Sequence, residues 1–347
     1  PDVLGEWSRT NIAVYGDYEV QATPDVLLGA ALRWEDYDTF GSTTNYKISG
    51  YWSITDTLAL RATQSSGFRA PTPGQANISN ITTLLSNGIL INRGTLPPTD
   101  PIARLYGGEE LTPERSENYS VGAVVNFGDV VVTIDGYQIE MRDRLTQSAD
   151  IQLTAQQAQD LEDAGFSGAS QLRSFRFYVN DFDTKTRGVD LVATYAFDMM
   201  AGQNLVTFIY NYNKTDVTYF NPATLDSLRI RQIEESLPSE RANLSWSYVQ
   251  GPWRSLLRIN YFGDYWIAHA GDPSMAFDPG AEVTLDAEAA FSLGEDNEYT
   301  VVVGAENLFN NFPDRNPYGT VIGAKYPESA PMGIAGGVYY LRFQYKI

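Results

Sequence analysis

The sequence contains no cysteine and only one histidine, His269, among its 347 residues. Without cysteine there is no disulfide, no thiol nucleophile and no thiolate metal site. A single histidine excludes an imidazole cluster and the paired histidines of common zinc motifs. The composition therefore excludes cysteine-dependent enzymes and metalloenzymes that use several histidines.

Long hydrophobic runs are also missing. No stretch approaches the ~18 apolar residues that a transmembrane helix requires. The chain does not open with the basic and apolar segments of a signal peptide, and we expect that residue 1 is not the start of the natural protein. A membrane protein with this sequence has to cross the bilayer with strands.

Positive charge is scarce, since 24 Lys and Arg residues stand against 43 Asp and Glu residues, a formal net charge of −19. This balance argues against a nucleic-acid partner. Aromatic residues, by contrast, make up 13% of the chain, with 22 Tyr and 6 Trp. That abundance is typical of the aromatic girdles that flank the apolar band of a membrane barrel.

What the sequence does contain is a two-residue alternation. Between residues 58 and 63, the side chains of Leu58, Leu60 and Ala62 share one face of a strand, and the other face carries Arg61 and Thr63. About thirteen such segments follow one another, separated in turn by short turns and about six long loops. This pattern predicts an all-β fold, a transmembrane antiparallel β-barrel.

Three of the long loops stand out. Residues 76–111 form a connection of roughly 36 residues, far longer than a usual loop, and indicate an external functional loop or disorder. Residues 153–165 predict a short helix inside a loop, with Thr154 as N-cap, Gln157 three residues later and Gly165 at the end. Residues 219–237 are polar and charged. A long strand is expected from about Ser174 to Phe197.

Four short stretches carry a resemblance to a known family. They are SGFRAPT at residues 66–72, LTPERSENY at 111–119, TRGVDL at 186–191 and ENLFN at 306–310. Together, and in this order, they resemble the motifs of TonB-dependent outer-membrane receptors over nearly the whole chain. The terminal strand up to Ile347 is similar to the C-terminal signal of such barrels, which usually end in an aromatic residue.

The resemblance implies a specific domain organisation. Receptors of this family have a barrel of twenty-two strands around a plug domain. Residues 1–347 are then expected to be the C-terminal portion of the barrel, without the plug, the TonB-contacting segment and about nine strands. The first and last of about thirteen strands would run in the same direction, so these strands alone cannot close an antiparallel cylinder.

The resemblance also implies a function. We expect capture of a scarce ligand at the external loops of the bacterial outer membrane, followed by uptake energised by the inner-membrane TonB complex through the missing N-terminal part. The ligand class would be siderophore-iron, haem, cobalamin or saccharide. A passive diffusion porin is the main alternative; a barrel enzyme would need a Ser-His-acid arrangement that His269 does not suggest. A soluble β-sandwich adhesin would have strands of about 5–6 residues.

Aromatic residues divide into two groups. Four lie on the predicted lipid face and are expected to anchor the barrel in the membrane: Trp34, Trp52, Trp246 and Tyr345. Six lie in or near external loops and are the candidate ligand contacts, with loop packing as their competing role: Tyr106, Phe182, Phe220, Trp266, Tyr318 and Tyr326.

No catalytic, cofactor or metal site is expected. Carboxylates with even spacing in strands are read as a water-facing wall rather than as a general acid and base. One acidic loop could supply oxygen ligands to a hard cation, but its spacing matches no calcium loop and a solvated loop is the favoured interpretation. Its residues are Asp264, His269, Asp272 and Asp278.

Overall fold

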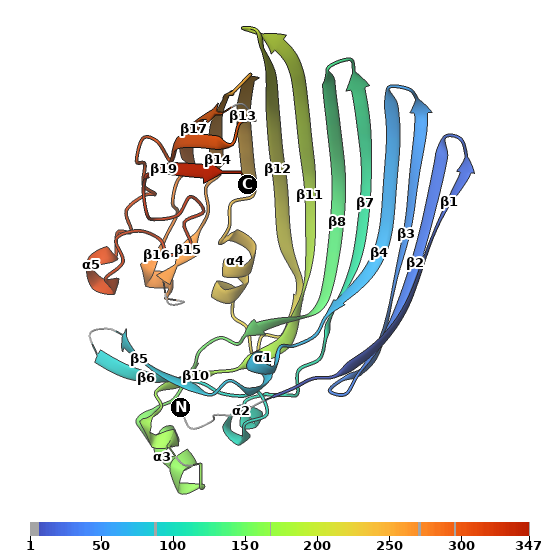
Figure 1. The fold of residues 1–347 in the computed structure, drawn as a ribbon. Coiled ribbons are helices and arrows are strands. Elements are labelled where there is room, and N and C mark those ends of the chain that lie inside the picture. The colour runs from blue at the N-terminus through green and yellow to red at the C-terminus, as the bar shows by residue number, and fades with distance from the viewer. Residues whose placement is uncertain (1–6, 87–88, 167, 270–271, 295, 347) are drawn as a thin grey trace.

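Thirteen long strands form one antiparallel sheet within residues 7–86, 89–166, 168–269, 272–294 and 296–346, the parts of the chain that the computed structural model describes (Figure 1). Each strand pairs with the next one along this order. The strands are β1 (Asn11–Thr23), β2 (Val26–Tyr37), β3 (Gly41–Thr55), β4 (Leu58–Arg69), β7 (Glu114–Phe127), β8 (Val130–Gln147), β11 (Tyr178–Met199), β12 (Gly202–Phe220), β13 (Glu240–Gln250), β14 (Trp253–Phe262), β17 (Glu282–Leu293), β18 (Tyr299–Glu306) and β19 (Val338–Tyr345). The predicted fold class and strand number are confirmed.

The sheet curves without closing. Its two ends are β1 and β19, and Figure 1 shows the strands bending into an open barrel wall with tight turns at one end and long connections at the other. No helix in the described ranges is long and apolar enough to cross a membrane. That finding concerns helices alone.

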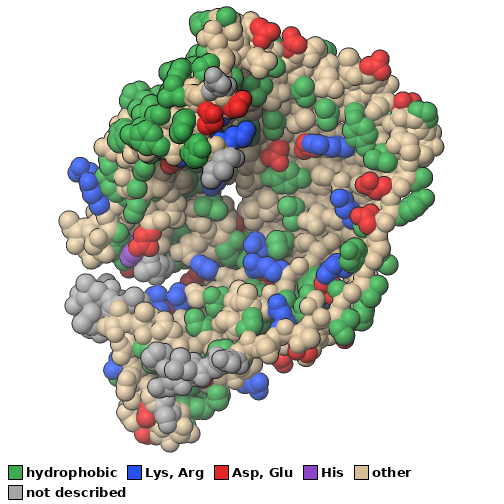
Figure 2. Space-filling view, viewed as in Figure 1, with side chains coloured by type: hydrophobic (Ala, Val, Ile, Leu, Met, Phe, Trp, Pro, Cys, Tyr) green, Lys and Arg blue, Asp and Glu red, His purple; other side chains and the backbone are tan. Residues whose placement is uncertain are grey.

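The two faces of the sheet differ in chemistry. Large apolar side chains project from the outer face with nothing covering them; Ile12 and Val14, for example, are 69% and 65% exposed. Charged pairs cross the inner face, such as Arg342 with Glu288 at 3.2 Å, and Figure 2 shows Lys and Arg side chains gathered inside the curve. An apolar surface of this extent marks contact with lipid rather than with water.

Two long connections fold together into a compact lobe below the sheet. A second, smaller sheet runs in the order β5 (Asn80–Ser86), β6 (Ile89–Thr95), β10 (Ser174–Arg176) and β9 (Ile151–Gln152). Helices α1 (Pro73–Asn77), α2 (Pro101–Leu105) and α3 (Ala155–Asp163) complete the lobe. Its apolar core includes Phe175, Phe177, Ala103 and Ala158. Residues 76–111 are therefore largely structured.

The lobe also corrects one predicted strand. The expected strand from about Ser174 to Phe197 is divided, because β10 pairs in parallel with β6 of the lobe while β11 belongs to the large sheet. The fully buried Phe177 lies between them. The alternation of side chains in the sequence does not show where a strand passes from one sheet to another, because the chain is extended in both.

The predicted loop helix is confirmed as α3. The hydroxyl of Thr154 accepts the Gln157 backbone N–H at 3.1 Å, and the Gln157 side chain accepts the Thr154 N–H at 2.9 Å. This reciprocal capping satisfies two donors that the first turn of a helix leaves free. Gly165 follows the helix with a φ of +96°, a conformation that suits glycine.

The later connections contain short elements that the alternation pattern does not predict. They are α4 (Ser227–Glu235), β15 (Ile267–Ala268), β16 (Ala276–Phe277) and α5 (Gly319–Ile322). Asp226 caps α4 by accepting the Arg229 N–H at 2.8 Å. Glu234 holds α4 to β12 by accepting the Val217 N–H at 2.7 Å. Ile347, the expected last residue of the terminal strand, lies outside the described residues.

Candidate functional site

A cavity of about 390 Å³ lies where the lobe meets α4, at the long-loop end of the sheet. Strands β6, β9 and β10 contribute to its wall, as do α4 and Ala268 of β15. Three arginines from three separate connections line it: Arg93, Arg176 and Arg229. The folding of these connections against one another is what brings the three guanidinium groups together.

Burial and mutual repulsion act on these arginines. Desolvation by burial lowers the pKa of Arg93 and of Arg229, and the positive charge of Arg176 lowers both further. Repulsion between the guanidinium groups is unfavourable in free energy, and a bound anion would reduce that repulsion. The arrangement therefore favours a negatively charged occupant.

Hydrogen bonds and one ion pair hold the three side chains, but some of their donors remain unpaired. Arg176 donates from Nε to the Thr95 hydroxyl at 3.5 Å. Arg229 donates to the Thr146 hydroxyl at 2.7 Å and to the Gln232 side chain at 3.1 Å. Arg93 forms an ion pair with Asp150. The Nε atoms of Arg93 and Arg229 are nevertheless buried without a hydrogen-bond partner among the described residues. Unpaired buried donors are costly and point to a missing acceptor.

Two carboxylates balance the three cations only in part. Asp150 is half-buried, and desolvation raises its pKa although Arg93 and Arg176 oppose that rise. Asp226 also lines the cavity, but it is exposed and already serves as the N-cap of α4. With both acids ionised the set carries 3 − 2 = +1. Guanidinium groups bind carboxylate, phosphate and similar oxyanions through paired, charge-assisted hydrogen bonds.

Three of the sequence-predicted aromatic contacts pack into protein. Tyr106 meets Phe175 edge-to-face with ring centroids 5.2 Å apart, at the edge of the lobe core. Phe182 is buried under Arg144, whose guanidinium lies 5.2 Å from the ring centroid. Trp266 is buried with Arg231 4.3 Å above its ring. Loop packing accounts for these contacts, and ligand contact by these residues stays a prediction.

The other three are more accessible. Phe220 is 37% exposed at the loop end of β12. Tyr326 stacks on Phe312 with ring centroids 5.2 Å apart, and the half-buried Tyr318 donates its hydroxyl to the Ala276 carbonyl at 3.2 Å. The structure does not bring these six residues together around one cavity, and none of them lines the arginine cavity.

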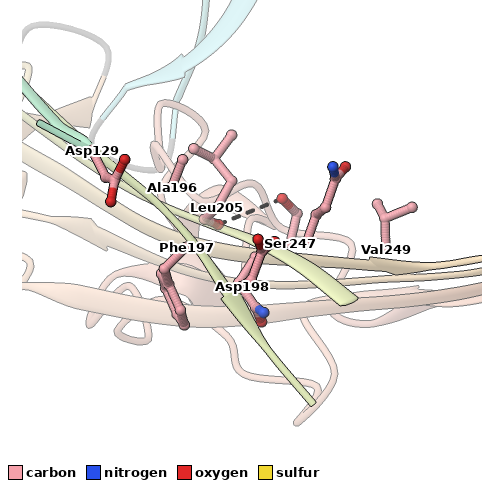
Figure 3. Close-up of a pocket in the computed structure, with 9 residues that line it drawn as sticks. Asp129, Ala196, Phe197, Asp198, Leu205, Ser247 and Val249 are labelled. Atoms are coloured by element: carbon pink, nitrogen blue, oxygen red, sulfur yellow. Dashed lines mark hydrogen bonds between the residues drawn. The ribbon is translucent and has the colours of Figure 1, made fainter. Parts of the chain in front are cut away.

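Two further cavities lie on the inner face. One of about 580 Å³ faces β14, β17 and β18, with Arg258, Asp286 and Glu288 among its lining. Another of about 550 Å³ lies near the short turns, where Ser247 donates to the Leu205 carbonyl at 3.5 Å and the acids are Asp129 and Asp198 (Figure 3). Of these three cavities, only the one between the lobe and α4 is lined by three arginines.

The motif residues found in the sequence have structural roles within strands or at their ends. Arg69 of the first motif and Glu114 of the second pair across β4 and β7, with Nη2 to Oε1 at 2.8 Å. Gly188 of the third makes room for the ring of Tyr137. Asn307 of the fourth adopts a φ of +52° and bonds Asn311 through both side-chain atoms. Arg69, Glu114 and Asn307 thus secure strand-to-loop transitions, whereas Gly188 lies inside β11.

Comparison with known proteins agrees with this architecture. A family model described as "TonB dependent receptor-like, beta-barrel" matches residues 2–308. A search of curated proteins finds no match.

Solved structures share the fold. The ferric enterobactin receptor PfeA of Pseudomonas aeruginosa superposes with a TM-score of 0.68 at 14% identity. The siderophore receptor PirA of Acinetobacter baumannii gives 0.65 at 14%, and the FrpB iron transporter of Neisseria meningitidis gives 0.62 at 16%. Each covers 97% of this chain, whereas the chain covers 45%, 46% and 45% of them, respectively.

The chain thus spans less than half the length of these receptors, and at such low identity the likeness shows the fold alone. The family match over most of the sequence goes further and confirms the resemblance drawn from the four motifs. The chain belongs to the TonB-dependent receptor family, and its open sheet is part of the β-barrel that places this family in the outer membrane.

Proposed function

We propose that the protein takes part in TonB-energised uptake of a negatively charged iron chelate of the siderophore class. The observation that carries this proposal is the cavity between the lobe and α4, which presents Arg93, Arg176 and Arg229 at the loop end of the barrel. Structurally similar proteins, among them a ferric enterobactin receptor and an iron transporter, support the same ligand class.

The chemistry of the cavity favours this ligand over the others. Ferric complexes of catecholate or carboxylate chelators are anions with several outward oxygen atoms, which match guanidinium donors. A neutral saccharide would leave the net positive charge of the cavity uncompensated. Saccharide recognition also uses exposed aromatic platforms, and aromatic rings do not line this cavity.

Energised uptake in this family also needs a plug domain and a segment that contacts TonB. We propose that residues 1–347 are the C-terminal portion of the receptor barrel, with a plug domain and a TonB-contacting segment contributed upstream. The loops would capture the ligand, and remodelling of the plug by the energised inner-membrane complex would let it pass along the polar inner face of the sheet.

The test is ligand binding to the full receptor purified in detergent, with ferric enterobactin as the anionic probe. Arg176→Gln removes one positive charge without breaking an ion pair found among the described residues. Loss of a charge-assisted hydrogen bond costs about 1.5–3 kcal/mol, or roughly tenfold to 150-fold in the dissociation constant. The exposed Arg104 of α2 provides the matched control Arg104→Gln. Equal affinities of the two variants would contradict the proposed anion site.

A transport measurement separates the receptor from a passive diffusion porin. Radiolabelled iron uptake into cells that express the full receptor should saturate with ligand concentration and stop when TonB is absent. Uptake that rises linearly with concentration and does not depend on TonB would favour the porin instead.

A further inference from the structure

A second polar cluster lies at the loop end of the C-terminal strands, away from the arginine cavity. Glu282 is the first residue of β17, Tyr265 lies in the connection after β14, and Asp314 lies in the connection before α5. Glu282 and Tyr265 are 6% and 5% exposed. The two carboxylate oxygens of Glu282 and the hydroxyl of Tyr265 are buried without a hydrogen-bond partner in the described part of the chain.

This cluster concentrates negative charge. The backbone N–H of Tyr265 donates to the Pro279 carbonyl at 3.3 Å, and the next residue, Gly280, donates to Asp314 at 2.8 Å, so Tyr265 and Asp314 both meet the chain just before Glu282. Desolvation raises the pKa of Tyr265, and the charges of Glu282 and Asp314 raise it further. The backbone N–H of Met332 lies near Glu282 without forming a hydrogen bond of good geometry. No salt bridge to Glu282 or Asp314 occurs within the described ranges. A buried carboxylate in such surroundings has to bind a cation or a proton.

Asp314 provides the entrance to the cluster. It is exposed, and its Oδ2 accepts the Gly280 backbone N–H at 2.8 Å, which fixes the carboxylate beside a residue two positions before Glu282. A set of two carboxylates and a hydroxyl offers oxygen atoms only, the ligands that hard divalent cations prefer. Calcium accepts an irregular arrangement of this kind, with water and backbone carbonyls completing its shell, whereas magnesium requires a near-ideal octahedron.

We propose that a calcium ion binds between Glu282 and Asp314, with the Tyr265 hydroxyl facing it. The ion would join β17 to the connections that flank it on either side and so fix the last external loops. No group of three or more His, Asp or Glu side chains in metal-binding geometry occurs among the described residues. Two carboxylates supplemented by a tyrosine are consistent with that finding and with a weak site in the range of about 0.1–1 mM, typical of extracellular calcium modules.

The test uses the full receptor, purified in detergent and freed of lipopolysaccharide, because lipopolysaccharide binds calcium itself. Terbium replaces calcium as a luminescent probe, since Tyr265 and the neighbouring Trp266 can sensitise its emission. Glu282→Gln keeps the size of the buried side chain but removes its charge. Asp314→Asn does the same at an exposed position, where folding is not at risk. Glu328→Gln, an exposed acid in the same connection as Asp314, is the matched control.

The wild type and Glu328→Gln should show terbium emission that calcium displaces, together with a calcium-dependent rise in melting temperature. Glu282→Gln and Asp314→Asn should bind calcium at least about tenfold more weakly. The same calcium response in all four proteins would overturn the proposal. So would a wild type without any calcium response, most clearly if Glu282→Gln were then the more stable protein, because the carboxylate would instead hold a proton.

Discussion

The ion pair between Arg69 and Glu114 predicts that loss of one partner destabilises the protein more than loss of the other. Glu114 is fully buried, whereas the Arg69 side chain is 61% exposed. Two hydrogen bonds join them, from Nε to Oε2 at 2.5 Å and from Nη2 to Oε1 at 2.8 Å, and Glu114 also accepts the Leu145 backbone N–H at 2.7 Å. One carboxylate thus ties together β4, β7 and β8.

Removal of either partner should have different consequences. Arg69→Ala leaves a buried carboxylate without its main counter-charge, which costs about 3–5 kcal/mol in comparable pairs. Arg144 still interacts with Glu114, so we expect the lower end, about 3 kcal/mol. Glu114→Gln leaves Arg69 in solvent and retains an acceptor for Leu145. Arg144 keeps its hydrogen bond to Thr184 and its place over the Phe182 ring, so the cost should be about 1–1.5 kcal/mol.

Hydrogen exchange of the Leu145 amide measures this difference locally. Exchange reports the free energy of local opening and does not require reversible unfolding of a whole barrel. Protection should fall about 150-fold in Arg69→Ala and about 5- to 12-fold in Glu114→Gln. Arg104→Ala, at an exposed site, should leave it unchanged. If Arg69→Ala behaved like this control, or if Glu114→Gln were the more damaging change, the reasoning would be refuted.

Three more predictions follow from single residues. Gly188→Ala places a Cβ 2.6 Å from the Tyr212 carbonyl oxygen and against the Tyr137 ring, so the urea midpoint should drop by an amount equivalent to about 1–3 kcal/mol; an unchanged midpoint would show that Tyr137 moves freely. Asn307→Ala loses both bonds to Asn311 and strains a φ of +52°, so residues 310–337 should be cut faster by protease, and Asn307→Gly should recover only the part due to strain. Burial raises the pKa of Asp150, so its protonation removes a negative charge from the arginine cavity as the pH falls. Binding of the anionic ligand should therefore be tighter at acidic pH than at neutral pH. Asp150→Asn should bind tightly at both pH values, and an equally steep pH dependence in that variant would assign the effect to another group.

The barrel wall could be predicted from the sequence because its rule is local. A strand with lipid on one side and water on the other must alternate, and the segment from Leu58 to Thr63 shows this alternation without any knowledge of its neighbours. The capping pair Thr154 and Gln157 is equally local, and α3 was found for that reason. A comparable signal for α4, Asp226 before a run that contains Leu228 and Ile230, was present but lay inside a segment interpreted as a polar loop.

The arginine cavity could not be predicted in the same way. Arg93, Arg176 and Arg229 are separated by more than fifty residues each, and only the folding of the lobe brings them together. The aromatic residues were conspicuous in the sequence, yet Phe182 and Trp266 are buried under arginines. A large ring near a loop indicates either packing or binding, and the sequence alone does not distinguish the two.

The central claim is that every second side chain of the sheet contacts lipid while the opposite row faces the lumen. Since the chain has no cysteine, single cysteines can be introduced at successive positions of β3 from Lys47 to Ile54 and labelled in intact outer membranes with a spin probe. The account predicts that Ile48, Trp52 and Ile54 positions report collisions with oxygen dissolved in lipid, and that Lys47, Ser49 and Ser53 positions report collisions with a water-soluble relaxation agent or contact with protein. Uniform accessibility along β3, without a period of two, would contradict it.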